Sequence, residues 1–331
     1  MNELSSKFVD QFALEKMLQE KLTKVHHSPL KSYFKSDQSS LDDFVAVRTD
    51  STNLALDRDE GSYRLITLPS SLPTEAYPEN NEIYLHYHPV PEANGNILWV
   101  HGLYDDNIQN YNYIIQLLNE SAFNVYIFIL PFHFERKPSA SLYSGEYYWS
   151  ADLFRSQYAA KQAIFDLKTA VGFIRNISPL PTVIAGFSMG GNVSLRYFLM
   201  EDRADGLFLI NPVTRLSQLI WESPLLRSVR GDLESAGYDL HQVEQLFQRL
   251  DPVKNIHYPP LRKPVALGYS VYDQIVGHAM YLEFVQKFRF ETTIAYNAGH
   301  LNILRVPKLA NDIGQYFDSV VEGAFRQKCE G

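Results

Sequence analysis

Hydrophobic positions along the chain switch repeatedly between the spacing of strands and the spacing of helices. Short continuous apolar runs, such as NILWV at 96–100 and VYIFIL at 125–130, are typical of strands buried on both faces of a parallel sheet. Ile164, Leu167 and Val171 instead recur at the spacing of one helix face. The predicted strands are 44–48, 63–68, 83–90, 96–100, 125–130, 182–187, 206–210, 265–271 and 292–296, and the predicted helices are 152–176, 192–200, 281–288 and 309–325.

This alternation predicts the fold class α/β, with a mostly parallel, doubly wound sheet and helices on both faces. The interval 213–260 breaks the alternation, because it has helical spacing and no clear strand. Insertions of this kind commonly cover the C-terminal edge of the strands, so we expect a helical cap there. Four apolar residues of the interval are candidates either for a pocket wall or for packing of the cap onto the core, namely Leu219, Ile220, Trp221 and Leu225.

The first part of the chain is predicted to be a helical extension. Leu14, Met17, Leu18 and Leu22 follow the spacing of an amphipathic helix, which we expect to dock on the body of the protein rather than on a partner. The expected organisation is an extension at 1–42, one domain at 43–325 that carries the cap at about 213–260, and a tail at 326–331.

Composition and charge narrow the function classes. The chain has 331 residues, 45% of them hydrophobic, and a formal net charge of −8, which argues against a nucleic-acid scaffold. The single cysteine, Cys329, excludes a disulfide within the chain and a cysteine zinc site. The polar N-terminus lacks the apolar stretch of a secretory signal, and no apolar run is long enough to span a membrane, so we expect a cytoplasmic protein.

The sequence GFSMGG at 186–191 is the strongest chemical signal. It lies between a predicted strand and a predicted helix, which is the context that a G-x-S-x-G nucleophile elbow requires. A sharp strained turn lifts the serine hydroxyl above the sheet, and side chains in place of the glycines would clash with the adjacent strand and helix. Ser188 is therefore the candidate nucleophile.

A serine nucleophile needs a base that a third group orients. His300 follows the last predicted strand at the same sheet edge, and His278 is the second candidate base. Asp273 follows the preceding strand, so Ser188, Asp273 and His300 occur in the order expected for this fold. The competing acids, Asp205 and Asp251, have the context of turn or cap residues.

The developing oxyanion also needs hydrogen-bond donors. The segment His101-Gly102-Leu103-Tyr104 directly follows the strand NILWV, so the N–H of Leu103 and the N–H of Met189 form the predicted oxyanion hole. His101 is expected to brace this loop rather than to transfer protons. His101 and Tyr104 are nevertheless candidates for the wall of the substrate pocket, as is Trp221 of the cap.

Together, the segments HGLYDD, GFSMGG, DQIV and AGH resemble the α/β-hydrolase superfamily. The resemblance covers about 80–325 and implies a Ser188–His300–Asp273 triad with the oxyanion hole described above. It does not specify a substrate, because the fold hosts many reactions.

A second, looser resemblance concerns the region 131–155. This region is similar to a little-characterised branch of abhydrolase-domain proteins, in which a longer aromatic and basic loop follows the fourth strand. The similar positions are Pro131-Phe132-His133, Arg136, Pro138, Ser144-Gly145 and Asp152…Arg155. Members of that branch are regarded as esterase-like or lipid-deacylase-like. His133 and Arg136 could contact a polar substrate group, although an internal salt bridge of Arg136 is the favoured interpretation.

Other sites are not expected. The sequence has no H-E-x-x-H motif, no phosphate-binding loop and no dinucleotide fingerprint, so we expect no cofactor. His86 and His88 share one face of a predicted strand, but packing is favoured over metal binding because no third ligand lies nearby.

The sequence therefore favours a serine hydrolase that cleaves a carboxylic ester of a small-molecule or lipid-like substrate. Acyl transfer, or hydrolysis of a thioester or an amide, would use the same triad. A binding protein that retains the fold without turnover is the alternative from another class. The acyl chain, the acceptor and the oligomeric state stay open.

Overall fold

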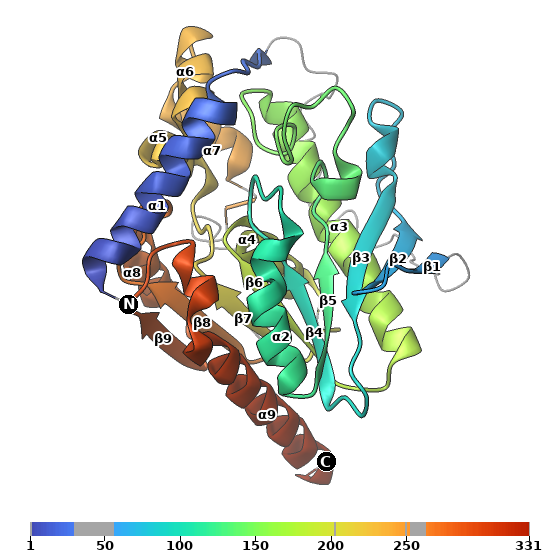
Figure 1. Cartoon of the computed structure of the whole chain (residues 1–331). Helices are drawn as coiled ribbons and strands as arrows, with labels where there is room; N and C mark the ends of the chain where they lie inside the picture. The colour runs from blue at the N-terminus through green and yellow to red at the C-terminus, as the bar shows by residue number, and fades with distance from the viewer. Residues whose placement is uncertain (1, 30–55, 202, 249, 252–262, 331) are drawn as a thin grey trace.

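The computed structural model describes residues 2–29, 56–201, 203–248, 250–251 and 263–330 (Figure 1). Within them, nine strands form one mixed sheet in the order β1-β2-β3-β5-β4-β6-β7-β8-β9. The strands are β1 Leu56–Asp59, β2 Arg64–Pro69, β3 Glu82–His88, β4 Gly95–Val100, β5 Phe123–Phe128, β6 Thr182–Phe187, β7 Gly206–Ile210, β8 Val265–Ser270 and β9 Thr292–Tyr296. The strands from β5 to β9 are parallel, and β1, β2 and β3 pair antiparallel at one edge. The predicted α/β sheet is confirmed.

The helices of the described residues pack on both faces of this sheet. They are α1 Glu3–Met17, α2 Asn112–Glu120, α3 Leu153–Ile177, α4 Met189–Met200, α5 Leu216–Glu222, α6 Arg227–Ser235, α7 Leu240–Phe247, α8 His278–Lys287 and α9 Pro307–Glu330. Apolar residues of α2 and α9 join one core cluster, and those of α3 and α4 join the other. The central strands alternate between the two clusters: Ile97 and Trp99 face one, whereas Leu98 and Val100 face the other.

The sequence patterns predicted most, but not all, of the strands and helices in the middle of the sheet and around it. The strands predicted at 182–187 and 206–210 coincide with β6 and β7. No element was predicted where α2 lies, and the helix predicted from residue 192 begins at Met189, because the chain turns directly from the strand into α4. The strand predicted at 44–48 falls outside the described residues. No helix in the described part of the chain is long and apolar enough to cross a membrane.

The N-terminal helix packs on the body of the protein. Leu14 on α1 is buried, and so are Leu18 and Leu22 in the π-helical turn Leu18–Leu22 that continues it. Figure 1 shows α1 along the side of the molecule that carries α8, with α5, α6 and α7 gathered near its C-terminal end. His26, beyond this helix, lies 2.6 Å from the carboxylate of Asp232 on α6.

In the described residues, the interval after β7 is helical. It contains α5, α6 and α7 and no strand. Gln157 on α3 donates a hydrogen bond of 2.9 Å to the carbonyl of Leu246 on α7, and the rings of Trp149 and Phe247 lie 4.9 Å apart. These contacts hold the helical insertion against α3 and the loop that precedes it.

Candidate active site

Ser188 occupies the junction between β6 and α4. Its backbone has φ 55° and ψ −118°, in the left-handed region that residues other than glycine rarely adopt. The Ser188 N–H donates to the carbonyl of Ile210 at 2.9 Å, and its own carbonyl accepts from the N–H of Val213 at 3.1 Å. Strain of this kind persists only where surrounding contacts impose it, and it is concentrated at functional sites.

Two glycines make this turn possible. A Cβ on Gly190 would lie 2.2 Å from the carbonyl oxygen of Val100 on β4. A Cβ on Gly186 would lie 2.8 Å from the carbonyl oxygen of Gly190. Both approaches are far shorter than a van der Waals contact, so the turn from β6 into α4 requires residues without a side chain at these positions.

The turns after β8 and β9 carry the other two predicted residues. His300 Nε2 lies 3.0 Å from Ser188 Oγ, and His300 Nδ1 lies 2.6 Å from Asp273 Oδ2. All three side chains are buried, with exposed fractions of 6% for Ser188, 5% for Asp273 and 3% for His300. The three residues therefore form one hydrogen-bonded chain at the C-terminal edge of the sheet.

Asp273 is fixed by more than its histidine. Its Oδ1 accepts the N–H groups of Ile275 at 2.7 Å and Val276 at 2.9 Å, and its Oδ2 accepts the Tyr281 hydroxyl at 2.5 Å. Burial by itself raises the pKa of Asp273. The charge and hydrogen bond of His300, together with the hydrogen bonds from Tyr281 and the backbone, lower this pKa by a larger amount. Its net pKa lies below the ordinary 3.8, so the group is a carboxylate at neutral pH.

The pKa of His300 is shifted in the opposite direction. Burial lowers it, but the charge of Asp273 and the hydrogen bond to it, followed by the charges of Asp10 and Asp105, raise it more. The net pKa lies above the ordinary 6.5. The site therefore stabilises the imidazolium that forms when His300 takes up a proton.

We expect this shift to appear in the pH dependence of catalysis. His300 can accept a proton only when it is neutral, so kcat/KM falls as the pH drops through its pKa in the free enzyme. Because that pKa is raised, the acidic limb should have its midpoint above 6.5. Hydrolysis of p-nitrophenyl acetate, followed from neutral to mildly acidic pH, measures it. A midpoint below 6.5 would contradict the electrostatics of the site.

The predicted oxyanion donors lie on two turns at the same edge. Met189 is the first residue of α4, directly after Ser188, and Leu103 follows β4. Within the described part of the chain, neither backbone N–H has a hydrogen-bond partner. The turn after β4 is held by Asp105, which accepts the Gly102 N–H at 3.0 Å and the hydroxyl of Tyr111. Neither N–H group is therefore committed to a hydrogen bond within these residues, as an oxyanion donor requires.

Comparisons with known proteins agree with this architecture. A family model described as the alpha/beta hydrolase fold matches residues 95–236, a segment that includes the turn after β4 and Ser188. The chain has the α/β-hydrolase fold. No curated protein matches it by sequence.

Three solved structures illustrate the likeness. An acetyl xylan esterase from Paenibacillus sp. R4 has TM-score 0.59 and 12% identity, covering 80% of this chain and 88% of its own. A soluble variant of monoglyceride lipase from Saccharomyces cerevisiae has TM-score 0.55 and 14% identity, covering 83% and 97%. A monoacylglycerol lipase from Paleococcus ferrophilus has TM-score 0.50 and 18% identity, covering 72% and 99%. At such identities the likeness shows the α/β-hydrolase fold alone.

Three predicted pocket residues, His101, Tyr104 and His133, are buried beside the turn after β4. His101 Nε2 accepts the N–H of Leu130 at 3.1 Å, and His133 Nε2 accepts the N–H of Tyr104 at 3.2 Å. Burial lowers the pKa of His133 to about 3 and that of His101 well below 6.5. Both rings are therefore neutral, and they brace the loops around the turn after β4. The Tyr104 hydroxyl donates to the carbonyl of Trp149 at 2.6 Å.

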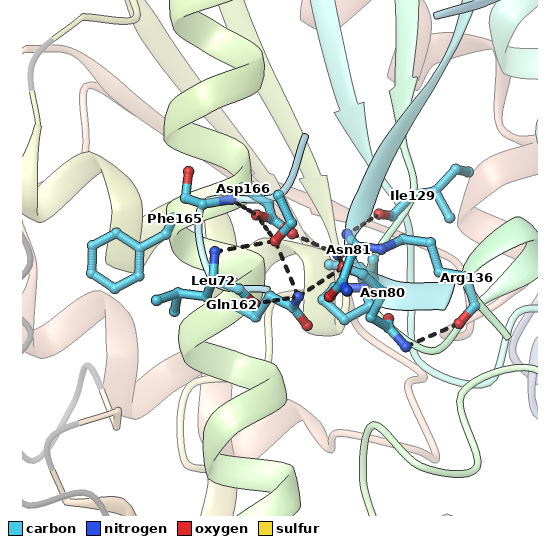
Figure 2. A network of polar contacts seen from close by, with 12 residues as sticks. Leu72, Asn80, Asn81, Ile129, Arg136, Gln162, Phe165 and Asp166 are labelled. Carbon is cyan, nitrogen blue, oxygen red and sulfur yellow. Dashed lines mark hydrogen bonds and ion pairs between the residues drawn. The ribbon is translucent and has the colours of Figure 1, made fainter. Parts of the chain in front are cut away.

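Arg136 has no exposed surface and lies in the polar network that Figure 2 shows. Its guanidinium is 2.6 Å from Asp166 Oδ2 on α3, and it also donates to the carbonyls of Ile129 at 3.1 Å and Asn80 at 2.9 Å. Asp166 Oδ1 accepts the hydroxyl of Ser70 at 2.7 Å. Arg136 thus forms the internal salt bridge favoured from the sequence, and the interpretation as a substrate contact is corrected, because the guanidinium is fully buried and its Nη1 and Nη2 groups bond to Ile129, Asn80 and Asp166.

Three of the remaining candidates, Trp221, His278 and Asp205, contact residues outside the hydrogen-bonded chain of Ser188, His300 and Asp273. Trp221 on α5 is half-buried, and its carbonyl accepts from Arg230 at 3.1 Å. The ring of His278 stacks on Tyr269 at 5.6 Å. Asp205 accepts the N–H of Thr182, the first residue of β6, at 2.8 Å, which is a turn role at the opposite edge of the sheet. Asp251, the other competing acid, is buried at 1% exposure.

The histidine pair on β3 lies in a different region. His86 Nε2 is 2.6 Å from Glu135 and its ring stacks on Tyr63 at 4.3 Å, whereas burial lowers the pKa of His88 to about 4. Both line a cavity of about 710 Å³ between β3 and α2. In the described residues, no three metal-binding side chains cluster.

Sequence reasoning missed several residues that support the triad. Tyr281 bonds Asp273, and Asn211 donates to the carbonyl of His300 at 3.1 Å and accepts the Ser270 N–H at 2.7 Å. Asp10 on α1 accepts the N–H of His300 at 2.6 Å. The sequence pattern could have identified Asp10, because it lies four residues before Leu14 and therefore on the same buried face of α1.

Proposed function

We propose that the protein is a serine hydrolase that cleaves a carboxylic ester through an acyl-enzyme on Ser188. The observation that carries the proposal is the hydrogen-bonded chain from Ser188 Oγ through His300 to Asp273, at 3.0 Å and 2.6 Å. It lies at a strained strand-to-helix turn, where the N–H of Met189 directly follows the serine, and the N–H of Leu103 lies on the turn after β4. These are the parts that acyl transfer to a serine requires.

The geometry assigns a role to each group. Ser188 Oγ attacks the ester carbonyl carbon while His300 Nε2 takes the hydroxyl proton. Asp273 accepts the Nδ1–H of His300, which keeps the Nε2 lone pair directed at the serine and stabilises the imidazolium. His300 then gives its proton to the leaving alcohol, and the acyl group stays on Ser188. A water molecule then attacks the acyl carbonyl carbon while His300 takes one of its protons. His300 returns this proton to Ser188 Oγ as the bond from Oγ to the acyl carbon breaks, and the carboxylic acid is released.

The N–H groups of Leu103 and Met189 would stabilise the negative oxygen of both tetrahedral intermediates. Removing one such donor costs about 10²–10³-fold in rate in related chemistry. The glycines of the elbow support this role, since they let the first turn of α4 approach the end of β4, as the short Gly190 to Val100 separation indicates.

The proposed substrate class rests on the names of the structural neighbours. The distant structural neighbours are named as an esterase and as lipases of monoacylglycerols, which favours ester or lipid-like substrates over other acyl compounds. Part of the acyl-binding wall would come from α5, α6 and α7 of the interval 213–260, which we propose is a cap of a single hydrolase domain. Residues 249 and 252–260 of this interval lie outside the described residues. A cytoplasmic location fits a chain whose single cysteine is Cys329.

Labelling with a fluorophosphonate tests the proposal directly. We expect the probe to modify wild-type protein and to leave Ser188→Ala unmodified, because the probe reacts with activated serine hydroxyls. The matched control is Ser319→Ala, which removes an exposed hydroxyl on α9 and should label like the wild type. Folded wild-type protein that stays unlabelled would refute the hydrolase and favour a binding protein.

A series of p-nitrophenyl esters of increasing acyl length then measures the size of the acyl site. Adding thioester and amide analogues, and an alcohol acceptor in place of water, separates ester hydrolysis from the reactions that use the same triad. Faster turnover of a thioester or an amide, or preferential transfer to the alcohol, would replace the ester assignment while keeping the roles of Ser188, Asp273 and His300.

A further inference from the structure

The N-terminal helix places a buried carboxylate against the turns that carry the triad. Asp10 on α1 has no exposed surface. Its Oδ2 accepts the N–H of His300 at 2.6 Å, and its Oδ1 accepts the N–H of Leu301 at 3.0 Å. The N–H of Gln274, the residue after Asp273, donates to Oδ2 at 3.3 Å. One side chain from the start of the chain thus binds the backbone beside both the base and the acid.

We propose that Asp10 is a positioning residue that holds the His300 turn and the Asp273 turn in register for catalysis. The inference rests on the proposed function, because it assigns Asp10 a role in the reaction of Ser188. Hydrogen bonds from backbone N–H groups to a carboxylate are stronger than those to a neutral acceptor, and several on one carboxylate fix its neighbours in place. On this view, the N-terminal helix is a working part of the active site.

The turn before His300 is shaped to receive α1. A Cβ on Gly299 would lie 2.7 Å from Asp10 Oδ2 and 2.7 Å from the carbonyl oxygen of Ser6, so only glycine allows this approach. Asn302 accepts the Gly299 N–H at 2.6 Å and donates to the Ser6 hydroxyl at 3.2 Å. Two turns of α1 therefore contact the turn that carries the base through matched polar groups.

The apolar face of the helix helps to keep Asp10 in place. Leu14, Leu18 and Leu22 are buried along the same side of the helix as Asp10, which seats α1 on the body of the protein. By contrast, Phe8 and Phe12 are exposed on the opposite side and stack on each other. The buried side, and not the exposed aromatic side, is the one that contacts the triad.

The charge of Asp10 has a second consequence. A buried carboxylate is costly unless its bonds compensate the lost hydration, and burial is the largest influence raising the pKa of Asp10. Three carboxylates raise the pKa of His300 through their charge, first that of Asp273 and then those of Asp10 and Asp105. Asp10 would thus stabilise the imidazolium in the transition state as well as hold the turn.

The test is Asp10→Asn in the full chain, with Glu15→Gln as the matched control. Glu15 is an exposed acid on the same helix, so the control removes the same charge without touching the site. We expect Asp10→Asn to lower kcat for p-nitrophenyl acetate, and the rate of fluorophosphonate labelling, by on the order of 10²-fold, with little change in KM. The acidic limb of the kcat/KM profile of Asp10→Asn should move to lower pH, because this variant neutralises one carboxylate that raises the pKa of His300.

A purely structural role would move only the melting temperature. Folded Asp10→Asn with the wild-type kcat and the wild-type acidic limb overturns the inference. If Asp10→Asn does not fold, the test uses Asp10→Glu, which keeps the charge but displaces the carboxylate. We expect this variant to have a lower kcat and an unshifted acidic limb of the pH–rate profile. A kcat equal to that of the wild type overturns the inference. Failure of the hydrolase proposal is distinct, since wild-type protein would then not label at all.

Discussion

Replacing Asp273 with asparagine should lower kcat for ester hydrolysis by about 10⁴-fold and leave the fold intact, as removal of the carboxylate does in other serine triads. In this protein, Oδ1 of Asp273 accepts two backbone N–H groups, those of Ile275 and Val276. An asparagine carbonyl would keep those bonds. Its NH₂ group would then take the place of Oδ2, which lies 2.6 Å from His300 Nδ1.

An NH₂ group at that point reverses the hydrogen bond. Nδ1 of His300 would have to accept, so the ring proton would move to Nε2, the nitrogen 3.0 Å from Ser188 Oγ. A protonated Nε2 cannot take the serine proton. The loss should appear in kcat and in fluorophosphonate labelling alike, whereas KM and the melting temperature should change little.

Two further variants make the comparison specific. Asp251→Asn changes a second buried acid that lies between Ser188 and His300 in sequence, and it should retain most of the activity. Tyr281→Phe removes one donor to Asp273 Oδ2 and should cost less than Asp273→Asn, because the histidine tautomer is preserved. Equal losses in Asp251→Asn and Asp273→Asn would withdraw the assignment of the acid.

The candidate triad was predictable because Ser188 directly follows β6, and Asp273 and His300 lie in the turns just after β8 and β9 of the parallel part of the sheet. Carboxyl ends of such strands meet at one edge, so an apolar run followed by serine, aspartate or histidine already implies proximity. The residues that support the triad follow no such rule. Asp10 lies 290 residues before its partner His300, and nothing in a helical stripe identifies a partner that tertiary packing alone supplies.

Helix α3 illustrates a second limit. Its spacing predicted one apolar stripe facing the sheet, yet Lys161, Gln162 and Asp166 are also buried. The reason is tertiary, because the loops at 70–81 and 132–152 cover the other side of the helix through hydrogen bonds such as the one from Gln162 to the carbonyl of Leu72 at 2.9 Å. Amphipathic spacing predicts which side of a helix faces the sheet. It does not predict whether loops bury the polar side chains on the other side of the helix.

The buried pair Arg136–Asp166 should dominate the stability of this region. Both side chains have no exposed surface, and their charged atoms are 2.6 Å apart. Substitution Arg136→Met leaves the carboxylate of Asp166 without its cation, and we expect the free energy of unfolding to fall by about 3–5 kcal/mol. The matched control is Arg64→Met, which breaks an exposed ion pair with Asp57 and should cost about 0–1 kcal/mol.

The pH dependence of the free energy of unfolding identifies why Arg136→Met loses stability. Burial already raises the pKa of Asp166 against the pull of Arg136, and removal of the cation should raise that pKa further. A carboxyl whose pKa in the folded state exceeds its unfolded value favours folding at low pH and loses that contribution as the pH rises. Arg136→Met should therefore regain part of its stability on mild acidification, as protonation neutralises Asp166.

Asp166→Asn provides the complementary case, because the guanidinium of Arg136 stays charged at every accessible pH and no recovery on acidification is expected. Urea unfolding of the three variants and the wild type at neutral and mildly acidic pH measures all of these differences. A loss in Arg136→Met that equals the loss in Arg64→Met, or that does not depend on pH, would show that the pair does not act as a buried charge pair in solution.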